Sequence, residues 1–474
     1  MGIETILLIV ALIFGFYMAW SIGANDVANA MGTSVGSKAL TLKKAVVLAA
    51  ILEFSGAFFV GTHVSETVRK GIINPEVFSS TPIIFVYGMM AALLAAAIWL
   101  QLASYFGWPV STTHSIVGSI LGFGIVVGGM RAIYWGKVSS IVASWVVSPV
   151  LSGSISFLIF TYLRKTIFFA RKPIQAAKKV TPYLVFCVFM VLTLVMMFKG
   201  LKNLHLNLSF PHALGIGILV GLLAAGISHL LVSRIEAEPT AERERTFQPA
   251  QVVHGLEKAV KHLERVKEAS VGAVQYQVAR LFDEVENLTS SVKQGTNVES
   301  GSSEFKAVEK IFVYLQILSA SLVAFAHGAN DVANAIGPLS AVIAVLSTGI
   351  VAVKSAVPIW VLALGGVGII FGLATWGWRV IETVGKRITD LTPSRGFSAE
   401  FGAALTIVFA SKLGLPISTT HTLVGAVLGV GLARGIGALN LNTVRDIVIS
   451  WIVTIPAGAG MAILFFYVLK ALFG

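Results

Sequence analysis

The sequence predicts an all-α polytopic membrane protein with about 12 transmembrane segments arranged in two related halves. Of its 474 residues, 56% are hydrophobic and 12% are charged, so the chain is far more apolar than a soluble domain. The apolar residues gather in runs of about twenty, the length of a membrane-spanning helix. One eight-residue sequence, Gly-Ala-Asn-Asp-Val-Ala-Asn-Ala, occurs twice without change, at 23–30 and 328–335. This repeat indicates an internal duplication.

A second pair of motifs follows the octapeptide in each half. Residues 109–114 read Pro-Val-Ser-Thr-Thr-His, and residues 416–421 read Pro-Ile-Ser-Thr-Thr-His. The aspartate of the octapeptide precedes the histidine by 88 residues in the first half and by 90 in the second. Each half therefore carries an acid between two asparagines, followed by a cluster of hydroxyl groups.

Apolar runs that can cross the membrane before residue 234 lie near residues 3–22, 42–62, 82–104, 109–129, 138–163, 181–198 and 212–233. The chain enters the first run directly, so we expect a membrane span there and not a removed leader. The fifth run is followed by the densest short basic loop, which contains Arg164, Lys165, Arg171, Lys172, Lys178 and Lys179. The positive-inside rule places this loop in the cytoplasm. We expect a first membrane repeat at 1–163 and two linking transmembrane helices at 164–233.

Residues 234–310 differ in composition from the rest of the chain. Of the 23 acidic residues, 13 lie between Glu236 and Glu309. Apolar residues recur there at spacings of three and four, which predicts amphipathic helices. We expect a cytoplasmic helical hairpin with polar linkers, of which 294–303 is the clearest; the alternative is a linker without helices.

The second membrane repeat is expected at 311–474, with spans near 311–327, 338–353, 356–378, 398–432 and 446–472. The run 398–432 is too long for one plain span, so we expect a break or re-entrant element at Leu415 and Pro416. The first repeat starts outside and the second inside, so the repeats are inverted, with both termini outside. Arg69, Lys70 and the basic residues at 379–395 fall on the outer face against the positive-inside rule. Inverted repeats with broken helices are the architecture of secondary transporters, whose sites lie near the midplane.

Ionisable groups inside a bilayer cost about 2.5–3.5 kcal/mol each on insertion scales, so those that persist are functional candidates. The acids within or beside apolar runs are Asp26, Glu53, Asp331 and Glu400. The two aspartates are the repeated pair. Aligning the halves places Ile369 opposite Glu53 and Leu93 opposite Glu400, so each glutamate is specific to its half. These glutamates could join a cation site, bind a proton or pair with an arginine.

The octapeptide predicts a cation site. Gly and Asn are poor helix formers, so we expect a local unwinding that frees carbonyl oxygens. Together with a carboxylate and two carboxamides, these oxygens suit a small alkali cation. The alternative is a small-residue packing face, which explains the Gly and Ala residues but not the Asp.

The second motif predicts an anion site. Its Pro stands at the first turn of a half-helix, and Ser-Thr-Thr follows, so backbone N–H groups and hydroxyls point at one spot. Two such helix N-termini from inverted halves could hold one tetrahedral oxyanion; alternatively, the hydroxyls bond only their own backbone. His114 and His421 close the motifs and are expected to support their neighbours, for example by bonding a carbonyl.

A divalent phosphate beside two ionised aspartates would be repelled in a low-dielectric site. Cations must therefore arrive with the anion, or the aspartates must be protonated. Cation coupling follows from the residues, whereas the choice between sodium and protons stays open.

Other functional classes fit the sequence poorly. The net charge of +12 is not arranged in a basic stripe interleaved with aromatic residues, so no nucleic acid is expected and the cations face anionic lipid. The single cysteine, Cys187, allows no intrachain disulfide. No Walker-type loop and no Cys/His metal cluster occurs, so we expect neither an enzyme nor a cofactor. An anion channel would be expected to present an open polar or basic pore, and the spans hold almost no Lys or Arg.

The duplicated octapeptide, the paired Ser-Thr-Thr-His motifs and the hydrophilic segment between the halves resemble the inorganic phosphate transporter (PiT) family, solute carrier family 20. The resemblance covers nearly all of the chain except that segment. It implies a homodimeric secondary transporter of the cell membrane that imports phosphate by sodium symport, with an elevator-like or rocking motion. Proton coupling, or transport of a related oxyanion such as sulfate, is the alternative.

Site residues carry over by position. The phosphate-binding candidates are Asn25, Ser111, Thr112, Thr113, Asn330, Ser418, Thr419 and Thr420. The sodium-binding candidates are Asp26, Asn29, Glu53, Asp331, Asn334 and Glu400. The Ser-Thr-Thr-His form of both motifs and the two retained glutamates favour sodium by analogy.

Overall fold

The computed structural model describes residues 2–60, 72–197, 209–234, 250–295, 303–351, 357–412 and 417–474. These residues are almost entirely helical, and they contain no strand beyond one isolated bridge between Ile73 and Ile133. The chain divides into two compact units. The first comprises Met1–Phe160, Cys187–Gly221 and Val313–Gly474, and the second comprises Thr161–Phe186 and Leu222–Phe312.

Eight helical stretches among the described residues are long and apolar enough to cross a membrane, and a further apolar helix, α6, is shorter. The helices of the first half are α1 (Ile3–Asn25), α2 (Val27–Gly36), α3 (Leu42–Val60), α5 (Pro82–Phe106), α6 (Thr112–Gly128) and α7 (Trp135–Leu163). The linking helices are α8 (Pro173–Val195) and α9 (Phe210–Ser233). The helices of the second half are α12 (Ser303–Thr348), α13 (Ile359–Trp376), α14 (Trp378–Glu382), α15 (Pro393–Lys412), α16 (Thr419–Arg434) and α17 (Leu441–Phe473).

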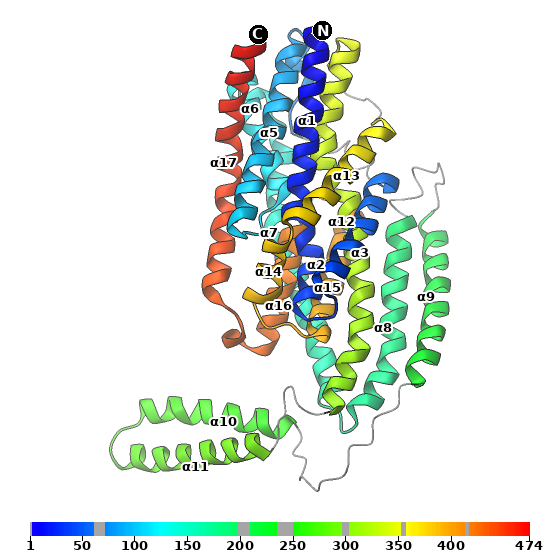
Figure 1. Ribbon diagram of the computed structural model, residues 1–474. Helices are drawn as coiled ribbons and strands as arrows, with labels where there is room; N and C mark the ends of the chain where they lie inside the picture. Colours follow the sequence, from blue (N-terminus) through cyan, green and yellow to red (C-terminus); the bar gives the residue numbers. More distant parts are fainter. Residues whose placement is uncertain are drawn as a thin grey trace. The chain divides into compact units, whose positions relative to one another are not determined.

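Equivalent helices of the two halves run in opposite directions. In Figure 1, α1 descends from the N-terminus while α12 rises, and α7 descends while α17 rises to the C-terminus. The inverted repeat that the sequence predicts is therefore visible in the first unit.

Tight glycine contacts follow the same symmetry. A Cβ atom added at Gly23 of α1 would lie 1.9 Å from the carbonyl oxygen of Ile369 in α13. A Cβ atom added at Gly328 of α12 would lie 2.2 Å from the carbonyl oxygen of Glu53 in α3. Both glycines belong to an octapeptide, so each copy packs backbone against backbone on a helix of the other half. Ile369 stands where the sequence alignment places it, opposite Glu53.

The octapeptides do not unwind, contrary to the expectation from their composition. In the first copy only Asp26 interrupts the helix assignment; its dihedral angles stay helical (φ −92°, ψ −36°), and its N–H donates to the Ile22 carbonyl at 2.8 Å. The second copy lies inside the continuous helix α12. The low helix propensity of Gly, about 1 kcal/mol below Ala, is outweighed because the close helix contacts require a residue without a side chain.

Helix α12 also replaces two expected spans, 311–327 and 338–353, with one helix of 46 residues that contains Pro338. The polar octapeptide between those spans does not form a loop, because its buried side chains find partners in other helices, as described below. The backbone groups left without helical partners around a proline are tolerated in such a helix when neighbouring groups satisfy them.

A half-helix is present at each hydroxyl motif, but the predicted position of its proline is wrong, because Ser111 caps α6 and Pro109 therefore lies before the first turn. Helix α5 ends at Phe106, and Gly107 turns the chain with a φ of +70°. Helix α6 begins after residues 108–111, which are not helical. In the second half α15 ends at Lys412 and α16 begins at Thr419. The break expected at Leu415 and Pro416 lies outside the described residues.

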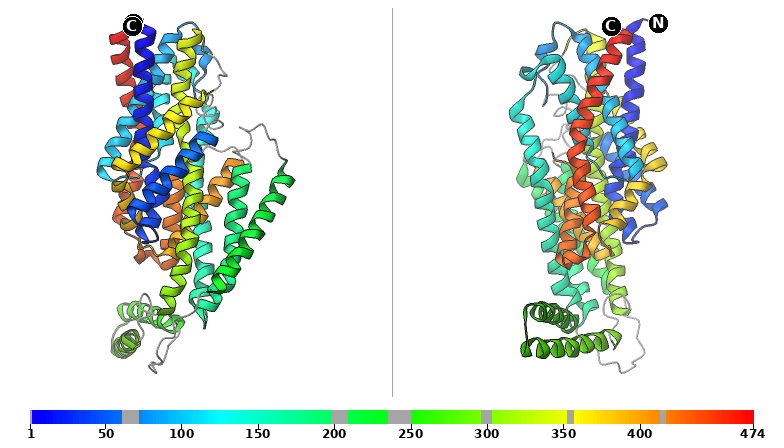
Figure 2. Two further views of the ribbon diagram at one scale, coloured as in Figure 1. Left: turned by 45° about the vertical axis from the view of Figure 1, so that its right-hand side comes forward. Right: turned by 90° about the vertical axis from the view of Figure 1, so that its left-hand side faces the viewer.

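In the second unit, a π-helical turn, Arg164–Phe168, follows α7, and the other predicted basic residues lie just after it. The periodic segment contains α10 (Ala250–Ala269) and α11 (Ala273–Gly295), which pack against each other as a hairpin (Figure 2). Gly272 makes the turn with a φ of +68°. Residues 296–302 of the expected linker lie outside the described residues.

Candidate functional site

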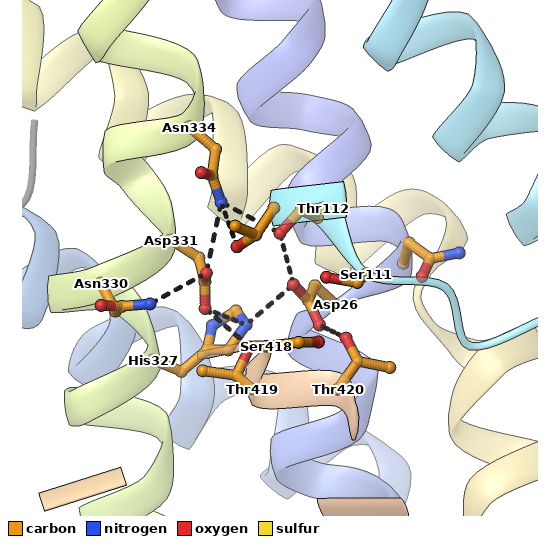
Figure 3. A network of polar contacts seen from close by, with 12 residues as sticks. Asp26, Ser111, Thr112, His327, Asn330, Asp331, Asn334, Ser418, Thr419 and Thr420 are labelled. Carbon is orange, nitrogen blue, oxygen red and sulfur yellow. Dashed lines mark hydrogen bonds and ion pairs between the residues drawn. The ribbon is translucent and has the colours of Figure 1, made fainter. Parts of the chain in front are cut away.

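The N-termini of the two half-helices meet the two repeated aspartates (Figure 3). The Thr112 hydroxyl of α6 donates to Asp26 at 2.7 Å, and the Thr419 hydroxyl of α16 donates to Asp331 at 3.0 Å. These two hydrogen bonds are symmetry equivalents, each within one half. Asp26 and Asp331 are at most 1% exposed.

Further hydrogen bonds join the halves to each other. The Thr420 hydroxyl donates to the other carboxylate oxygen of Asp26 at 2.5 Å. The side-chain amide of Asn334 in α12 lies 3.1 Å from the Thr112 hydroxyl, 3.3 Å from the Thr113 hydroxyl and 3.3 Å from Asp331. The two motifs of both halves thus form one buried polar cluster.

His327, which the sequence reasoning did not select, occupies the centre of this cluster. Its Nε2 lies 3.0 Å from Asp331 and 3.5 Å from Asp26, and its Nδ1 lies 2.9 Å from Glu53. The imidazole therefore brings Glu53 of α3 into the same cluster as the two aspartates. His327 can supply at most one positive charge to three buried carboxylates.

Asp26, His327 and Asp331 also have the geometry of a cation site. Their ligand atoms all lie within 4.8 Å of one another. Carboxylate oxygens are the ligands that hard cations prefer, and imidazole nitrogen suits transition metals or a proton. The arrangement can therefore bind a small cation, exchange a proton, or do both.

The asparagines of the octapeptides have different surroundings. The Asn25 amide donates to the Ser104 hydroxyl and the Trp108 carbonyl, both at 3.0 Å, and its oxygen accepts the Val110 N–H at 3.2 Å. Asn25 thus holds the segment that leads to α6. The Asn330 amide lies 3.3 Å from Asp331. The side chain of Asn29 lies outside the described part of the structure.

The serines of the second motif cap the half-helices. The Ser111 oxygen accepts the N–H of His114 at 3.2 Å, and the Ser418 oxygen accepts the N–H of His421 at 3.1 Å. Such caps satisfy one of the N–H groups that a helix start leaves without a partner. Both serines remain able to donate their hydroxyl protons toward a ligand, and both are buried.

Glu400 does not join the central cluster. Its Oε1 accepts from the hydroxyls of Thr33 (2.5 Å) and Ser34 (2.8 Å) of α2, and its Oε2 accepts from Ser319 (2.5 Å) of α12. The Gln316 amide lies 3.4 Å from Oε1. Glu400 is 0% exposed, so it forms a second buried carboxylate site of hydroxyl and amide oxygens. We call Thr33, Ser34, Gln316, Ser319 and Glu400 the Glu400 site.

The histidines that end the motifs lie on α6 and α16 behind the threonines. Their ring centroids are 4.2 Å apart, and each ring packs on a tryptophan, His114 on Trp145 and His421 on Trp451. Both histidines are buried, and their ring contacts stabilise the first turns of α6 and α16.

Three residues of this region escaped the sequence reasoning. Trp145 and Trp451 lie in a repeated Ser-Trp-x-Val pattern at 144–147 and 450–453, a third duplication that a comparison of the halves reveals. His327 has no such signal, because the equivalent position of the first half is Ile22. Its only mark in the sequence is a polar residue directly before the second octapeptide.

Comparison with known proteins identifies the family of this chain. The model of the phosphate transporter family matches residues 22–462. The chain is 45% identical to inorganic phosphate transporter 2-1, chloroplastic, of Arabidopsis thaliana over 464 residues, covering 96% of this chain and 71% of that protein. A solved structure of a protein named as the sodium-dependent phosphate transporter superposes with a TM-score of 0.78 at 38% identity, covering 98% of this chain and 99% of that chain. The chain is therefore a multi-pass membrane transporter, not an enzyme, and it belongs to the phosphate transporter family.

Proposed function

We propose that this protein imports inorganic phosphate together with sodium ions. The observation that carries the proposal is the contact of two half-helix N-termini with two buried carboxylates through Thr112 and Thr419. Helix N-termini attract an anion, whereas the carboxylates attract cations. In this site each carboxylate is hydrogen-bonded to a helix N-terminus, so an anion and cations can bind next to each other.

The charges of the site explain why the anion and the cation are coupled. Two unit charges of the same sign 4 Å apart repel by about 4 kcal/mol at the effective dielectric constant of partly buried pairs. Asp26, Asp331 and Glu53 would therefore oppose phosphate binding unless cations neutralise them. The same carboxylates hold a cation more tightly when phosphate is present, which is the reciprocity expected of coupled binding.

We assign the sodium ions to two places. The central cluster offers Asp26, Asp331, Glu53 and Asn334, with Asn29 on the same octapeptide, and the Glu400 site offers a second set of oxygen ligands. The sodium dependence named for the superposed transporter supports sodium as the ion. His327 favours protons as the second candidate, because its imidazole lies within 3.0 Å of Asp331 and can carry one.

The phosphate is assigned to the two helix starts. Ser111, Thr112 and Thr113 face it from the first half, and Ser418, Thr419 and Thr420 from the second. The threonines that donate to Asp26 and Asp331 in this structure turn to the phosphate oxygens when it binds, so that the carboxylates can bind sodium. Asn330 lies beside Asp331, and Asn25 contributes by holding the segment before α6.

We propose that the protein lies in the cell membrane as a homodimer, with both termini outside and the segment 234–310 in the cytoplasm. The basic residues at 164–179 support this orientation through the positive-inside rule.

Uptake of labelled phosphate into proteoliposomes tests the proposal. We expect accumulation with an inward sodium gradient, little accumulation with an inward proton gradient alone, and weak competition by sulfate. Accumulation with a proton gradient alone would show that protons, not sodium ions, are the coupling ions at this site. Strong inhibition by sulfate would widen the substrate to related oxyanions, and the absence of uptake under both gradients would refute symport.

A further inference from the structure

The third duplicated pattern, Ser-Trp-x-Val, brings four aromatic rings together behind the phosphate motifs. Trp145 of α7 packs on His114 with ring centroids 3.6 Å apart, and Trp451 of α17 packs on His421 at the same distance. The two histidine rings are 4.2 Å apart, edge to face. We call these four side chains the ring clamp. It is a continuous stack that runs from one half of the protein to the other.

Hydrogen bonds tie the ring clamp to the phosphate motifs of the opposite half. The Trp451 indole N–H donates to the Pro109 carbonyl at 3.0 Å, two residues before the cap of α6. The Nδ1 of His421 lies 3.2 Å from the Trp145 carbonyl, to which it donates. Both contacts cross between the halves. They connect the start of each half-helix to a tryptophan-bearing helix.

The helices that carry the rings are locked to one another by glycines at equivalent positions. A Cβ atom at Gly118 of α6 would lie 2.7 Å from the Ile455 carbonyl oxygen of α17. A Cβ atom at Gly425 of α16 would lie 2.4 Å from the Pro149 carbonyl oxygen of α7. Each glycine stands four residues after a motif histidine, and Pro149 and Ile455 each stand four residues after a clamp tryptophan. The bodies of the half-helices are therefore held by backbone contact with the other half.

Between these two pairs of helices, the contact of the two histidine rings joins α6 to α16 near their N-termini. His114 is 2% and His421 is 3% exposed, so the rings are enclosed by protein. Packed interiors resist compression, so rings in direct contact oppose a closer approach of the backbones that carry them. The hydrogen bonds to the Pro109 and Trp145 carbonyls oppose a wider separation. Thr113 and Thr420 directly precede the two histidines, so the distance between the helix backbones also determines the distance between these threonines.

We propose that the ring clamp sets the distance between the two half-helix N-termini and thereby selects the bound oxyanion by size. The inference rests on the proposed phosphate site and deepens it by naming the residues that determine its specificity. Trp145, His114, His421 and Trp451 act as positioning residues, because they act on the anion only through the helix starts. Phosphate fits the separation that the intact clamp imposes, whereas the larger arsenate ion fits a wider one.

Replacing Trp451 tests the proposal at the point where the clamp contacts the motif. The Trp451→Leu variant loses the ring and the bond to Pro109, and Trp451→Phe loses the bond but keeps a smaller aromatic ring. The matched control is Trp360→Leu on α13, where the tryptophan is 50% exposed. Purified proteins are assayed for binding of phosphate, arsenate and sulfate by calorimetry, and for uptake in proteoliposomes.

We expect Trp451→Leu to raise the KM and Kd for phosphate about tenfold and to leave kcat within about twofold. The ratio of arsenate to phosphate affinity should move about threefold toward arsenate, because the helix starts are no longer held at the phosphate spacing. Trp451→Phe should raise the KM about threefold, the equivalent of one net hydrogen bond. Trp360→Leu should behave as the unsubstituted protein.

A lower kcat with unchanged KM and unchanged arsenate preference in a folded Trp451→Leu protein would overturn the proposal. If that variant does not fold, His421→Leu decides in the same way, because it also removes one ring of the clamp. If the unsubstituted protein binds a different tetrahedral oxyanion, the proposed function fails, yet the same affinity ratios measured around that anion still test the clamp.

Discussion

In the function that we propose, the transport chemistry depends on the two repeated aspartates. Asp26 accepts one threonine hydroxyl from each half-helix start, Asp331 accepts one from α16, and each aspartate is within 3.5 Å of His327. Acids so deeply buried are costly unless they bind cations or protons during the cycle. Removing one charge therefore weakens ion binding directly, while the shape of the side chain stays almost unchanged.

Replacing Asp26 or Asp331 with asparagine should reduce sodium-driven phosphate uptake by about 100-fold or more, corresponding to a loss of about 2.7 kcal/mol. The physical reason is that a carboxamide has a similar volume but no negative charge to balance sodium. Uptake in proteoliposomes measures the effect, and size-exclusion chromatography checks folding. Asp446→Asn is the control, because that side chain is 53% exposed and pairs with its neighbour Arg445. Normal uptake by both substituted proteins would refute the coordination that we propose.

Glu400 lies apart from the central cluster, so its replacement should have a different signature. We expect Glu400→Gln to raise the sodium concentration for half-maximal uptake about tenfold while the KM for phosphate at saturating sodium changes little. Glutamine has nearly the same shape and keeps one oxygen for the hydroxyls of Thr33 and Ser34, but it carries no charge. A sodium titration of uptake measures this. An unchanged sodium dependence would leave the Glu400 site with a structural role only.

At the scale of helices, specificity for one fold comes from backbone-to-backbone contacts. Two pairs of equivalent glycines, Gly23 with Gly328 and Gly118 with Gly425, leave no room for a Cβ atom next to a carbonyl oxygen of another helix. Such close approach is how helices associate without a hydrophobic driving force in the bilayer. In the octapeptides it also explains why the chain stays helical where composition predicted unwinding.

A methyl group at one of these contacts should therefore be destabilising. We expect Gly425→Ala to lower the free energy of unfolding by about 1–3 kcal/mol, because the new Cβ would lie 2.4 Å from the Pro149 carbonyl oxygen. The thermal unfolding midpoint in detergent measures this loss. Gly215→Ala on α9 is the control, since nothing lies within 4 Å of a Cβ there and alanine favours the helix. Equal midpoints for the two variants would contradict the packing argument.

At the scale of the whole molecule, the inverted repeat has a testable consequence for membrane orientation. A single cysteine introduced at Gly2, in a Cys187→Ser background, should react with a membrane-impermeant maleimide in intact cells. A cysteine at Gly272, in the turn of the hairpin, should react only after permeabilisation. The reason is that an odd number of crossings before the basic loop separates the N-terminus from it. The opposite labelling pattern would show that the protein has the opposite orientation in the membrane, with the same fold.

Sequence alone is sufficient for the family, the membrane class and the duplication. Three features can be recognised without a structure: the excess of apolar residues, the identical octapeptides and the paired Ser-Thr-Thr-His motifs. The presence of a half-helix at each hydroxyl motif was also predicted, but its first residue was not: the sequence placed the proline in the first turn, whereas Ser111 and Ser418 cap the helices. The contact of Thr112 with Asp26 joins the two motifs of the first half.

Tertiary structure alone decided which buried acids share a cluster. Glu53 reaches the aspartates only through His327, and Glu400 is surrounded by hydroxyls of α2 and α12 that are far from it in the sequence. The continuity of α12 through its octapeptide was equally inaccessible, because low helix propensity was outweighed by packing on α3. These features depend on contacts between the two halves of an inverted repeat. Local sequence patterns predict which helices form, but they do not predict which helices of the two halves contact each other.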